Sequence, residues 1–190
     1  PLNINVPFAP ESERSGLGDT DFHRACWYER EFELEDWGDL KVLLHFGAVD
    51  WQARVWVNHI KVVEHQGGHT PFSADITFAL IRGKPQRISV WAEDDPHDLE
   101  KPRGKQDWRR EPHSIWYPRT TGIWQPVWLE YVSNPYIETV RWTPNLERWE
   151  ISFDAYIGGA QLEGISLSVR ISCGTWVIAE DVYQVTGTEL

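Results

Sequence analysis

The sequence predicts an all-β protein made of two β-sandwich domains in succession. The strand patterns are short, and turn residues follow them at intervals of about 8–12 residues, as in sandwich folds. No pattern with the period of a helix is longer than about two turns. The strand pattern then restarts after Ser133-Asn134-Pro135. We therefore expect a first domain over residues 1–133 and a second over residues 134–190.

Residues 52–58 give the clearest strand of the first domain, because Ala53, Val55 and Val57 alternate with polar or large residues. Residues 40–46 are almost continuously apolar, which indicates a strand covered on both faces. Asn58-His59 is a turn signal, so the strands on either side form a hairpin. Further strands are expected at 24–34, 60–64, 71–76, 87–92 and 122–132, with an extended arm at 1–23 and a helical turn at 78–81.

The composition excludes several classes of function. The net charge of −11 argues against nucleic acid or an anionic membrane as a partner. No apolar run reaches the length of about 18 residues that spans a membrane. Phosphate- and dinucleotide-binding motifs, HExxH and similar zinc patterns are absent, so we expect no cofactor and no metal. Cys26 and Cys173 lie in different predicted domains and are expected to be two buried, unpaired thiols that act as small apolar residues.

The chain has no methionine and begins abruptly at Pro1. Both features indicate a piece of a longer protein. An N-terminal leader would not be visible in such a piece, and we assign the protein to the cytoplasm. The twelve tryptophans are expected, for the most part, to fill the core of the sandwich.

The long segment 93–125 is the candidate functional region, because loops of this length are usually functional or disordered. It holds Trp108, Trp116, Tyr117 and Trp124, so we expect it to be packed and ordered. Rigid aromatic rings beside carboxylates and guanidinium groups suit a hydroxyl-rich ligand such as a sugar. Composition alone favours a plainer interpretation, in which the tryptophans plug the end of the sandwich.

A resemblance to a known family lies in the same residues. AEDDPHDLEKPRGKQDW (92–108) and SIWYPRTTGIWQPVWLE (114–130) follow VPFAPES (6–12), SGLG (15–18), WYEREFEL (27–34), HFGAVDWQARVWVN (45–58) and GGHTPFSADIT (67–77). In this order and spacing, the segments resemble the bacterial β-galactosidase and β-glucuronidase-like branch of glycoside hydrolase family two. His59 departs from the pattern, since a glycine commonly follows the VN there.

The resemblance implies a jelly-roll, galactose-binding-like sandwich at 1–133, followed by an immunoglobulin-like sandwich and then a catalytic (β/α)₈ barrel on the same polypeptide. The barrel carries both catalytic glutamates of the family, so none of the catalytic residues lies in this chain. An immunoglobulin-like sandwich needs about 100 residues and seven strands, whereas residues 135–190 show four strand patterns. We expect this domain to be partial, with Val169, Ile171 or Val177 on an uncovered face or edge, which leaves open assembly into a homo-oligomer.

The resemblance also implies that an acidic residue at the end of the strand 87–92 reaches the sugar site. The match leaves Glu93 and Asp94 as alternatives, with Asp95 and Asp98 as weaker candidates. Trp108 and Trp116 are the candidates for stacking on a β-linked carbohydrate. Two other interpretations remain open: a stand-alone carbohydrate-binding module that uses exposed aromatics, and a purely structural interaction domain.

Overall fold

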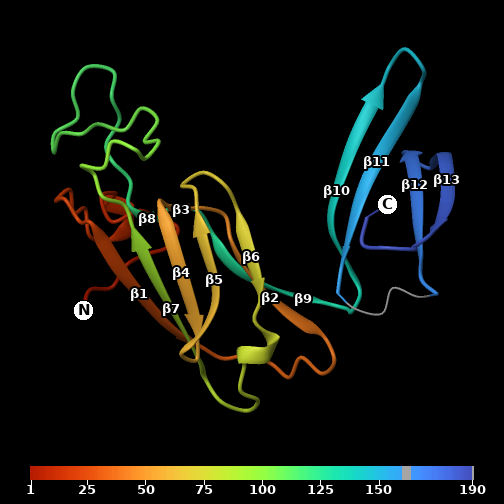
Figure 1. Cartoon of the computed structure of the whole chain (residues 1–190), viewed down its shortest axis with the longest axis horizontal. Coiled ribbons are helices and arrows are strands. Elements are labelled where there is room, and N and C mark those ends of the chain that lie inside the picture. The colour runs from red at the N-terminus through yellow and green to blue at the C-terminus, as the bar shows by residue number, and fades with distance from the viewer. Residues whose placement is uncertain (160–163, 190) are drawn as a thin grey trace. The chain divides into compact units, whose positions relative to one another are not determined.

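The computed structural model describes residues 1–159 and 164–189 (Figure 1). The chain divides into two compact units, Pro1–Tyr131 and Val132–Leu190, and each is described by itself. Strands dominate both units, which confirms the prediction of an all-β protein. The helical elements in the described residues are two 3₁₀ turns, η1 (Glu13–Ser15) and η2 (Thr77–Ala79). No helix there is long and apolar enough to cross a membrane.

The first unit is a β-sandwich whose sheets are formed by strands far apart in the sequence. Its antiparallel four-stranded sheet has the order β1 (Ala25–Phe32), β7 (Gln86–Glu93), β4 (Gln52–Val57) and β5 (Ile60–Gln66). A three-stranded sheet has the order β6 (Phe72–Asp75), β2 (Lys41–Phe46) and β9 (Val127–Val132), and β3 (Val49–Asp50) pairs with β8 (Gly122–Ile123).

The core lies between the two larger sheets and follows the predicted alternation. Ala53, Val55 and Val57 of β4 are fully buried, and they pack in one cluster with Leu44 and Phe46 of β2. In β2, the consecutive residues 42–44 are all buried, as expected for a strand covered on both faces. Each fully buried aliphatic or aromatic side chain contributes about 1.5–3 kcal/mol, so this cluster is the main source of stability in the unit.

Two expectations about this unit were wrong. The single strand expected at 122–132 is two strands, β8 and β9. Pro126 lies between them, and a proline has no N–H to donate to a sheet. The tryptophans do not fill the core: of the twelve, Trp37 is the one that is buried. Six are exposed, namely Trp27, Trp108, Trp128, Trp142, Trp149 and Trp176. In β4 and β7, small and branched residues occupy the inward positions, so Trp56 and Trp91 fall on the outward positions and are half-buried.

The second unit consists of two antiparallel hairpins, β10 (Tyr136–Asn145) with β11 (Glu150–Gly158) and β12 (Ser166–Cys173) with β13 (Trp176–Gln184). The aromatic ring of Phe153 contacts those of Trp142 and Tyr183, with ring centroids 5.6 Å and 5.1 Å apart, and so links the hairpins. Val169 and Ile171 are half-buried, whereas Val177 is 55% exposed.

Both cysteines are free thiols, but the prediction that both are buried was wrong for Cys173. Cys26 lies in β1 of the first unit and is partly buried, whereas Cys173 lies at the end of β12 in the second unit and is exposed. Burial raises the pKa of the Cys26 thiol, with a smaller contribution from the negative charge of Glu11. The thiol of Cys26 is therefore protonated at neutral pH and acts as a small apolar group of the sandwich.

Candidate functional site

The loop between β7 and β8 projects beyond the ends of the strands (Figure 1) and is held by its own hydrogen bonds. Gln106 and Tyr117 form a parallel β-bridge. The backbone N–H of Asp107 donates to the carbonyl of Tyr117 (2.8 Å), and the N–H of Tyr117 donates to the carbonyl of Lys105 (2.9 Å). These bonds join the two arms of the loop, so it is a packed segment, as its aromatic content predicted.

The carboxylate of Asp107 organises the tip of this loop. Its side chain is buried, and it accepts hydrogen bonds from the backbone N–H of Arg109 (3.0 Å) and from the backbone N–H and ring Nδ1 of His113 (2.6 Å each). Burial acts to raise the pKa of Asp107, but the hydrogen bonds from His113 and Arg109 outweigh it and hold the pKa below its usual range. The sequence singled out neither Asp107 nor His113. The spacing from Asp107 to Arg109, typical of an Asx turn, is the one local signal.

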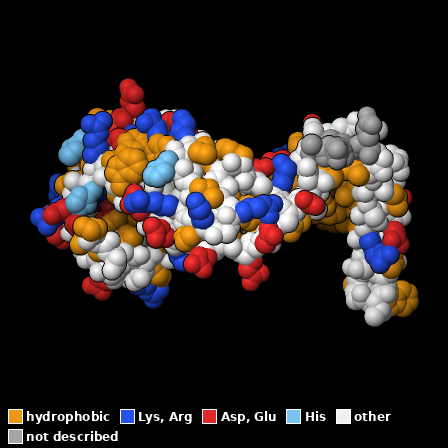
Figure 2. Space-filling view, turned by 90° about the horizontal axis from the view of Figure 1, so that it is seen from below, with side chains coloured by type: hydrophobic (Ala, Val, Ile, Leu, Met, Phe, Trp, Pro, Cys, Tyr) orange, Lys and Arg blue, Asp and Glu red, His pale blue; other side chains and the backbone are white. Residues whose placement is uncertain are grey.

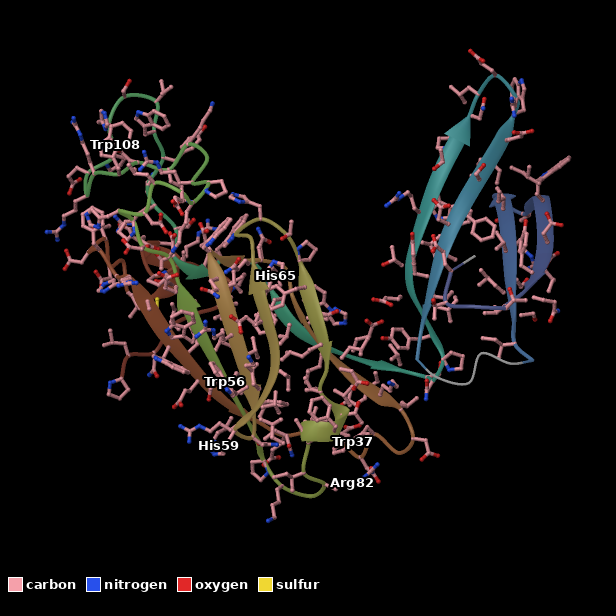
Figure 3. All side chains as sticks on the ribbon, in the orientation of Figure 1. Trp37, Trp56, His59, His65, Arg82 and Trp108 are labelled. Atoms are coloured by element: carbon pink, nitrogen blue, oxygen red, sulfur yellow. The ribbon has the colours of Figure 1, made fainter. Side chains whose placement is uncertain are left out.

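The two candidate stacking residues of the loop contact each other. Trp108 and Trp116 meet edge to face, with ring centroids 5.4 Å apart. His113 packs edge to face on Trp108 (5.2 Å), and the guanidinium of Arg103 lies 5.1 Å from the Trp108 ring centroid. Trp108 nonetheless remains 42% exposed at the outer end of the loop (Figure 3), while Trp116 is half-buried. Of the two rings, Trp108 is the more accessible to a ligand.

A buried polar group joins the base of the loop to the sandwich. Asp50, at the end of β3, is 4% exposed. Its Oδ2 accepts a hydrogen bond from Nε2 of Gln106 (2.9 Å) and lies 3.4 Å from the hydroxyl of Thr120, which donates to it. Gln106 in turn accepts from the backbone N–H of Thr120 (2.8 Å). Sequence analysis missed this group, although a lone aspartate directly after the apolar Ala48-Val49 is a signal that could have found it.

Asp94, at the end of β7, lies beside this group and takes part in none of the ion pairs found in the described residues. Burial raises the pKa of Asp94 to about 7, and the negative charge of Asp50 adds to the effect, while Lys101 opposes it. Burial also raises the pKa of Asp50, against the hydrogen bond from Gln106. Two carboxyl groups here share one low-dielectric environment, which favours the neutral form of at least one of them.

The other predicted acidic residues have structural partners. Glu93 is paired with Lys101 (2.9 Å), and both side chains are 13% exposed. Arg24 lies 3.6 Å from the carboxylates of both Glu93 and Asp95. Asp95 also accepts from the backbone N–H of His97 (2.9 Å), and Asp98 accepts from that of Glu100 (3.0 Å). The structure thus brings Glu93, Asp94, Asp95 and Asp98 to one end of the sandwich. They differ in how many ion pairs and hydrogen bonds hold each carboxylate in place.

Three of these carboxylates, Asp94, Asp95 and Asp98, line a small cavity of about 20 Å³ together with Asp50, Lys101 and Arg103. One water molecule needs about 10–15 Å³ by this measure, and pockets for small ligands usually measure about 300–1,000 Å³. The cavity therefore has room for water but not for a sugar ring. Within the described residues, no group of three His, Cys, Asp or Glu side chains is placed to hold a metal ion.

The N-terminal arm is fixed to this end of the sandwich by Arg119. The guanidinium is buried, donates to the carbonyl of Asp21 (2.9 Å) and lies 4.0 Å from the ring centroid of Phe22. The backbone N–H of Thr121 donates to the carboxylate of Glu11 (3.2 Å). Residues from the arm, from β3, from β7 and from the loop thus form a single rim.

Known proteins similar to this chain are glycoside hydrolases. Residues 4–98 match the family model described as glycosyl hydrolases family 2, sugar binding domain. A β-galactosidase from Thermoanaerobacter pseudethanolicus is 32% identical over 122 residues, and a β-glucuronidase from Mus musculus is 40% identical over 88 residues. These matches cover 63% and 44% of this chain, but only 15% and 13% of the two relatives.

Solved structures show the same fold at low sequence identity. The β-glucuronidase from Bifidobacterium dentium, solved in complex with coumarin-3-O-glucuronide, superposes with a TM-score of 0.76 at 18% identity, covering 100% of this chain and 36% of its own. A β-glucuronidase from Faecalibacterium prausnitzii gives a TM-score of 0.67 at 21% identity, covering 97% of this chain and 35% of its own.

Proposed function

Because this chain belongs to glycosyl hydrolase family 2 and carries the family's sugar-binding domain at residues 4–98, we propose that it is the non-catalytic N-terminal region of a β-glycosidase. The complete enzyme hydrolyses O-glycosyl bonds in β-galactosides, β-glucuronides or related β-glycosides. Its catalytic (β/α)₈ barrel lies on the same polypeptide. The present chain braces that barrel and contributes loop residues to the rim of its sugar site.

The observation that supports this proposal most directly is that Asp94 is half-buried next to Asp50 and has a raised pKa. A half-buried carboxyl group beside a second one, outside every ion pair of the described residues, costs stability whenever it ionises. Groups of this kind concentrate at functional sites. We assign Asp94 to hydrogen bonds with sugar hydroxyls. Glu93, paired with Lys101, holds the loop in place.

The remaining rim residues have supporting roles in the same proposal. Asp95 and Asp98 lie at the edge of the small cavity, where water or sugar hydroxyls reach them. Trp108 offers its exposed side as a stacking surface, and Trp116 contacts its ring edge to face. A stand-alone carbohydrate-binding module at this rim would need more room than the cavity gives. A purely structural interaction domain would give no reason for an unpaired Asp94.

The test is made in the longest polypeptide that contains this chain. A charged hydrogen bond is worth about 1.5–3 kcal/mol, so Asp94→Asn should lower kcat/KM by roughly 10- to 150-fold with aryl β-glucuronides or β-galactosides. The melting temperature should not fall. Glu93→Gln is the matched variant, since it also removes one charge at constant size. It should lower the melting temperature, because it breaks the contact with Lys101.

Three results would contradict the proposal. Unchanged kcat/KM in Asp94→Asn would remove this residue from sugar binding. Parallel losses of activity and stability in both variants would favour a loop that only braces the domain interface. Turnover of an aryl β-glycoside by the 190-residue chain alone, abolished by replacing a carboxylate within it, would show that the chain is itself catalytic.

A further inference from the structure

The outward face of the four-stranded sheet carries three tryptophans on adjacent strands. Trp27 of β1 lies opposite Trp91 of β7, which lies opposite Arg54 of β4. In the next outward row, Ser89 of β7 lies between Glu29 of β1 and Trp56 of β4. The inward neighbours of these residues form the core, so the tryptophans take the solvent side of a rigid, well-packed sheet.

Two rings of this tryptophan face, defined as Trp27, Trp56 and Trp91, contact each other directly. Trp27 and Trp56 belong to strands separated by β7, yet their ring centroids are 5.3 Å apart with an interplanar angle of 32°. The small side chain of Ser89 on β7 leaves room for this approach. Trp27 is 63% exposed. The guanidinium of Arg54 lies 4.8 Å from the ring centroid of Trp91 and extends the surface sideways.

Several charged groups around this face are paired with one another. Arg54 contacts Glu64 (2.9 Å), Arg87 contacts Glu29, and Gln52 donates to Glu64 (3.0 Å). Figure 2 likewise shows acidic and basic side chains interspersed over the first unit, without a patch of one sign on the side it displays. A neutral ligand fits such a surface better than a polyanion, because no excess positive charge is available.

The mixture of rings and hydrogen-bonding groups favours a sugar over a protein. The core of a protein interface is depleted of charged residues, whereas here the ion pair Arg54–Glu64 borders the tryptophans directly. Sugars present an apolar C–H face to the negative face of an aromatic ring and direct hydroxyls sideways to polar groups. The guanidinium of Arg54 has further N–H donors beyond the Nε that bonds to Glu64.

We propose that the tryptophan face is a second carbohydrate-binding surface, which holds a neutral glycan chain by stacking on Trp27 and Trp56 with Arg54, Glu64 and Gln52 alongside. Trp56 lies toward the end of the sheet near the His59 turn, whereas Trp108 lies in the loop at the other end (Figure 3). The surface therefore starts away from the rim at Trp56, whereas Gln52 at its other margin pairs with Glu93 of the rim. It retains polysaccharide near the enzyme and does not depend on the rim's role in catalysis.

The experiment is native electrophoresis of the 190-residue chain in gels containing β-1,4-galactan, mixed-linkage β-glucan or polygalacturonate. At least one of the two neutral polymers should retard the chain, and the anionic polymer should not. The double variant Trp27→Ala/Trp56→Ala should bind about tenfold more weakly or not at all. Trp128→Ala is the matched control, since it removes a 45%-exposed tryptophan from the other sheet. It should be retarded like the unmodified chain.

Several results would overturn the proposal. These are absence of retardation by both neutral polymers, equal losses in the double variant and the control, or retardation by polygalacturonate alone. Self-association that the double variant abolishes, without any effect of glycan, would show instead that the face binds a second copy. If the double variant fails to fold, the single variant Trp27→Ala replaces it in the same electrophoresis, because this exposed ring contributes little to the core. Circular dichroism verifies that the single variant is folded.

Discussion

The two units use the same alternating strand pattern with different results. In Pro1–Tyr131, two sheets enclose a continuous core from β2, β4 and β7, and at the end of this sandwich Asp50 is buried with the half-buried Asp94 beside it. In Val132–Leu190, the buried residues of the described part are Ala155, Ile157 and Val185, and every residue of β13 is exposed.

This difference shows that alternation specifies a strand but not its burial. A two-stranded sheet is at best marginally stable by itself, and it gains stability when a second layer covers it. The second layer in the first unit comes from strands that are distant in sequence, since β1 pairs with β7 and β9 joins β2. Buried charged groups follow from that layering, because only a packed end of a sandwich excludes water from a carboxylate.

The largest expected effect is in the core of the first unit. Phe46→Ala removes a ring that is 1% exposed and stacks on Phe72 at 4.8 Å, so it should cost about 3–5 kcal/mol in the free energy of unfolding. Val182→Ala, at a 62%-exposed position of β13, should change it by less than about 0.5 kcal/mol. Denaturant unfolding measures both. Equal losses would mean that the second unit has a core as extensive as the first.

A smaller effect, opposite in sign, is expected at Asp94. An acid whose pKa is near 7 when folded and near 3.8 when unfolded is protonated in both states below about pH 3. The loss of folding stability caused by this carboxyl group grows as the pH rises from about 4 to 7, and it is complete above pH 7. The full shift corresponds to about 4 kcal/mol, which partial exposure reduces. Asp94→Asn should therefore raise the free energy of unfolding by roughly 1–2 kcal/mol at pH 8, and by about a quarter of that amount near pH 4.5.

Urea unfolding of Asp94→Asn and the unmodified chain between pH 4.5 and 8 tests this expectation. Glu93→Gln provides the contrast, because loss of its bond to Lys101 should destabilise the chain by about 1–3 kcal/mol. A stability difference between Asp94→Asn and the unmodified chain that does not change with pH would refute the raised pKa.

The smallest effect concerns hairpin turns, where both units carry the same local strain. His59 in the turn between β4 and β5 has φ 69°, and Trp149 between β10 and β11 has φ 55°. A residue other than glycine in the left-handed region destabilises the folded state by about 1–2 kcal/mol. Replacing it with glycine removes this strain, but part of the gain is lost because glycine loses more backbone entropy on folding. His59→Gly and Trp149→Gly should each gain about 0.5–1 kcal/mol in thermal unfolding.

Asn58→Gly is the control for the first turn. Its side chain donates to the carbonyl of Ala79 (2.9 Å) and accepts from the backbone N–H of Arg87 (2.9 Å), so the variant should lose stability despite a φ of 47°. A gain in Asn58→Gly would mean that these bonds contribute less than the backbone strain. A gain in stability from His59→Gly without one from Trp149→Gly would mean that the left-handed conformation of Trp149 adds no strain to the second hairpin.

The sequence by itself determined the local elements of this protein. Val55 and its neighbours specify β4, the apolar run specifies β2, Asn58-His59 specifies the hairpin, and the aromatics of the long loop indicate that it is packed. These are properties of neighbouring residues, and the period of a strand or the composition of a loop can be read along the chain. The resemblance likewise rested on short segments in order, and the family match agrees with it.

Only the tertiary structure decided which polar groups meet. Asp50 and Gln106 are 56 positions apart, and Asp50 and Thr120 are 70 apart, so their contact depends on the sheet order and on the fold of the loop. The same holds for the tryptophans, most of which the sequence assigned to the core: Trp37 is buried, whereas Trp27, Trp56 and Trp91 lie on the outer face of the four-stranded sheet. The physical reason is that burial is set by what covers a strand. In this chain the covering layer comes from distant segments whose pairing leaves no local pattern in the sequence.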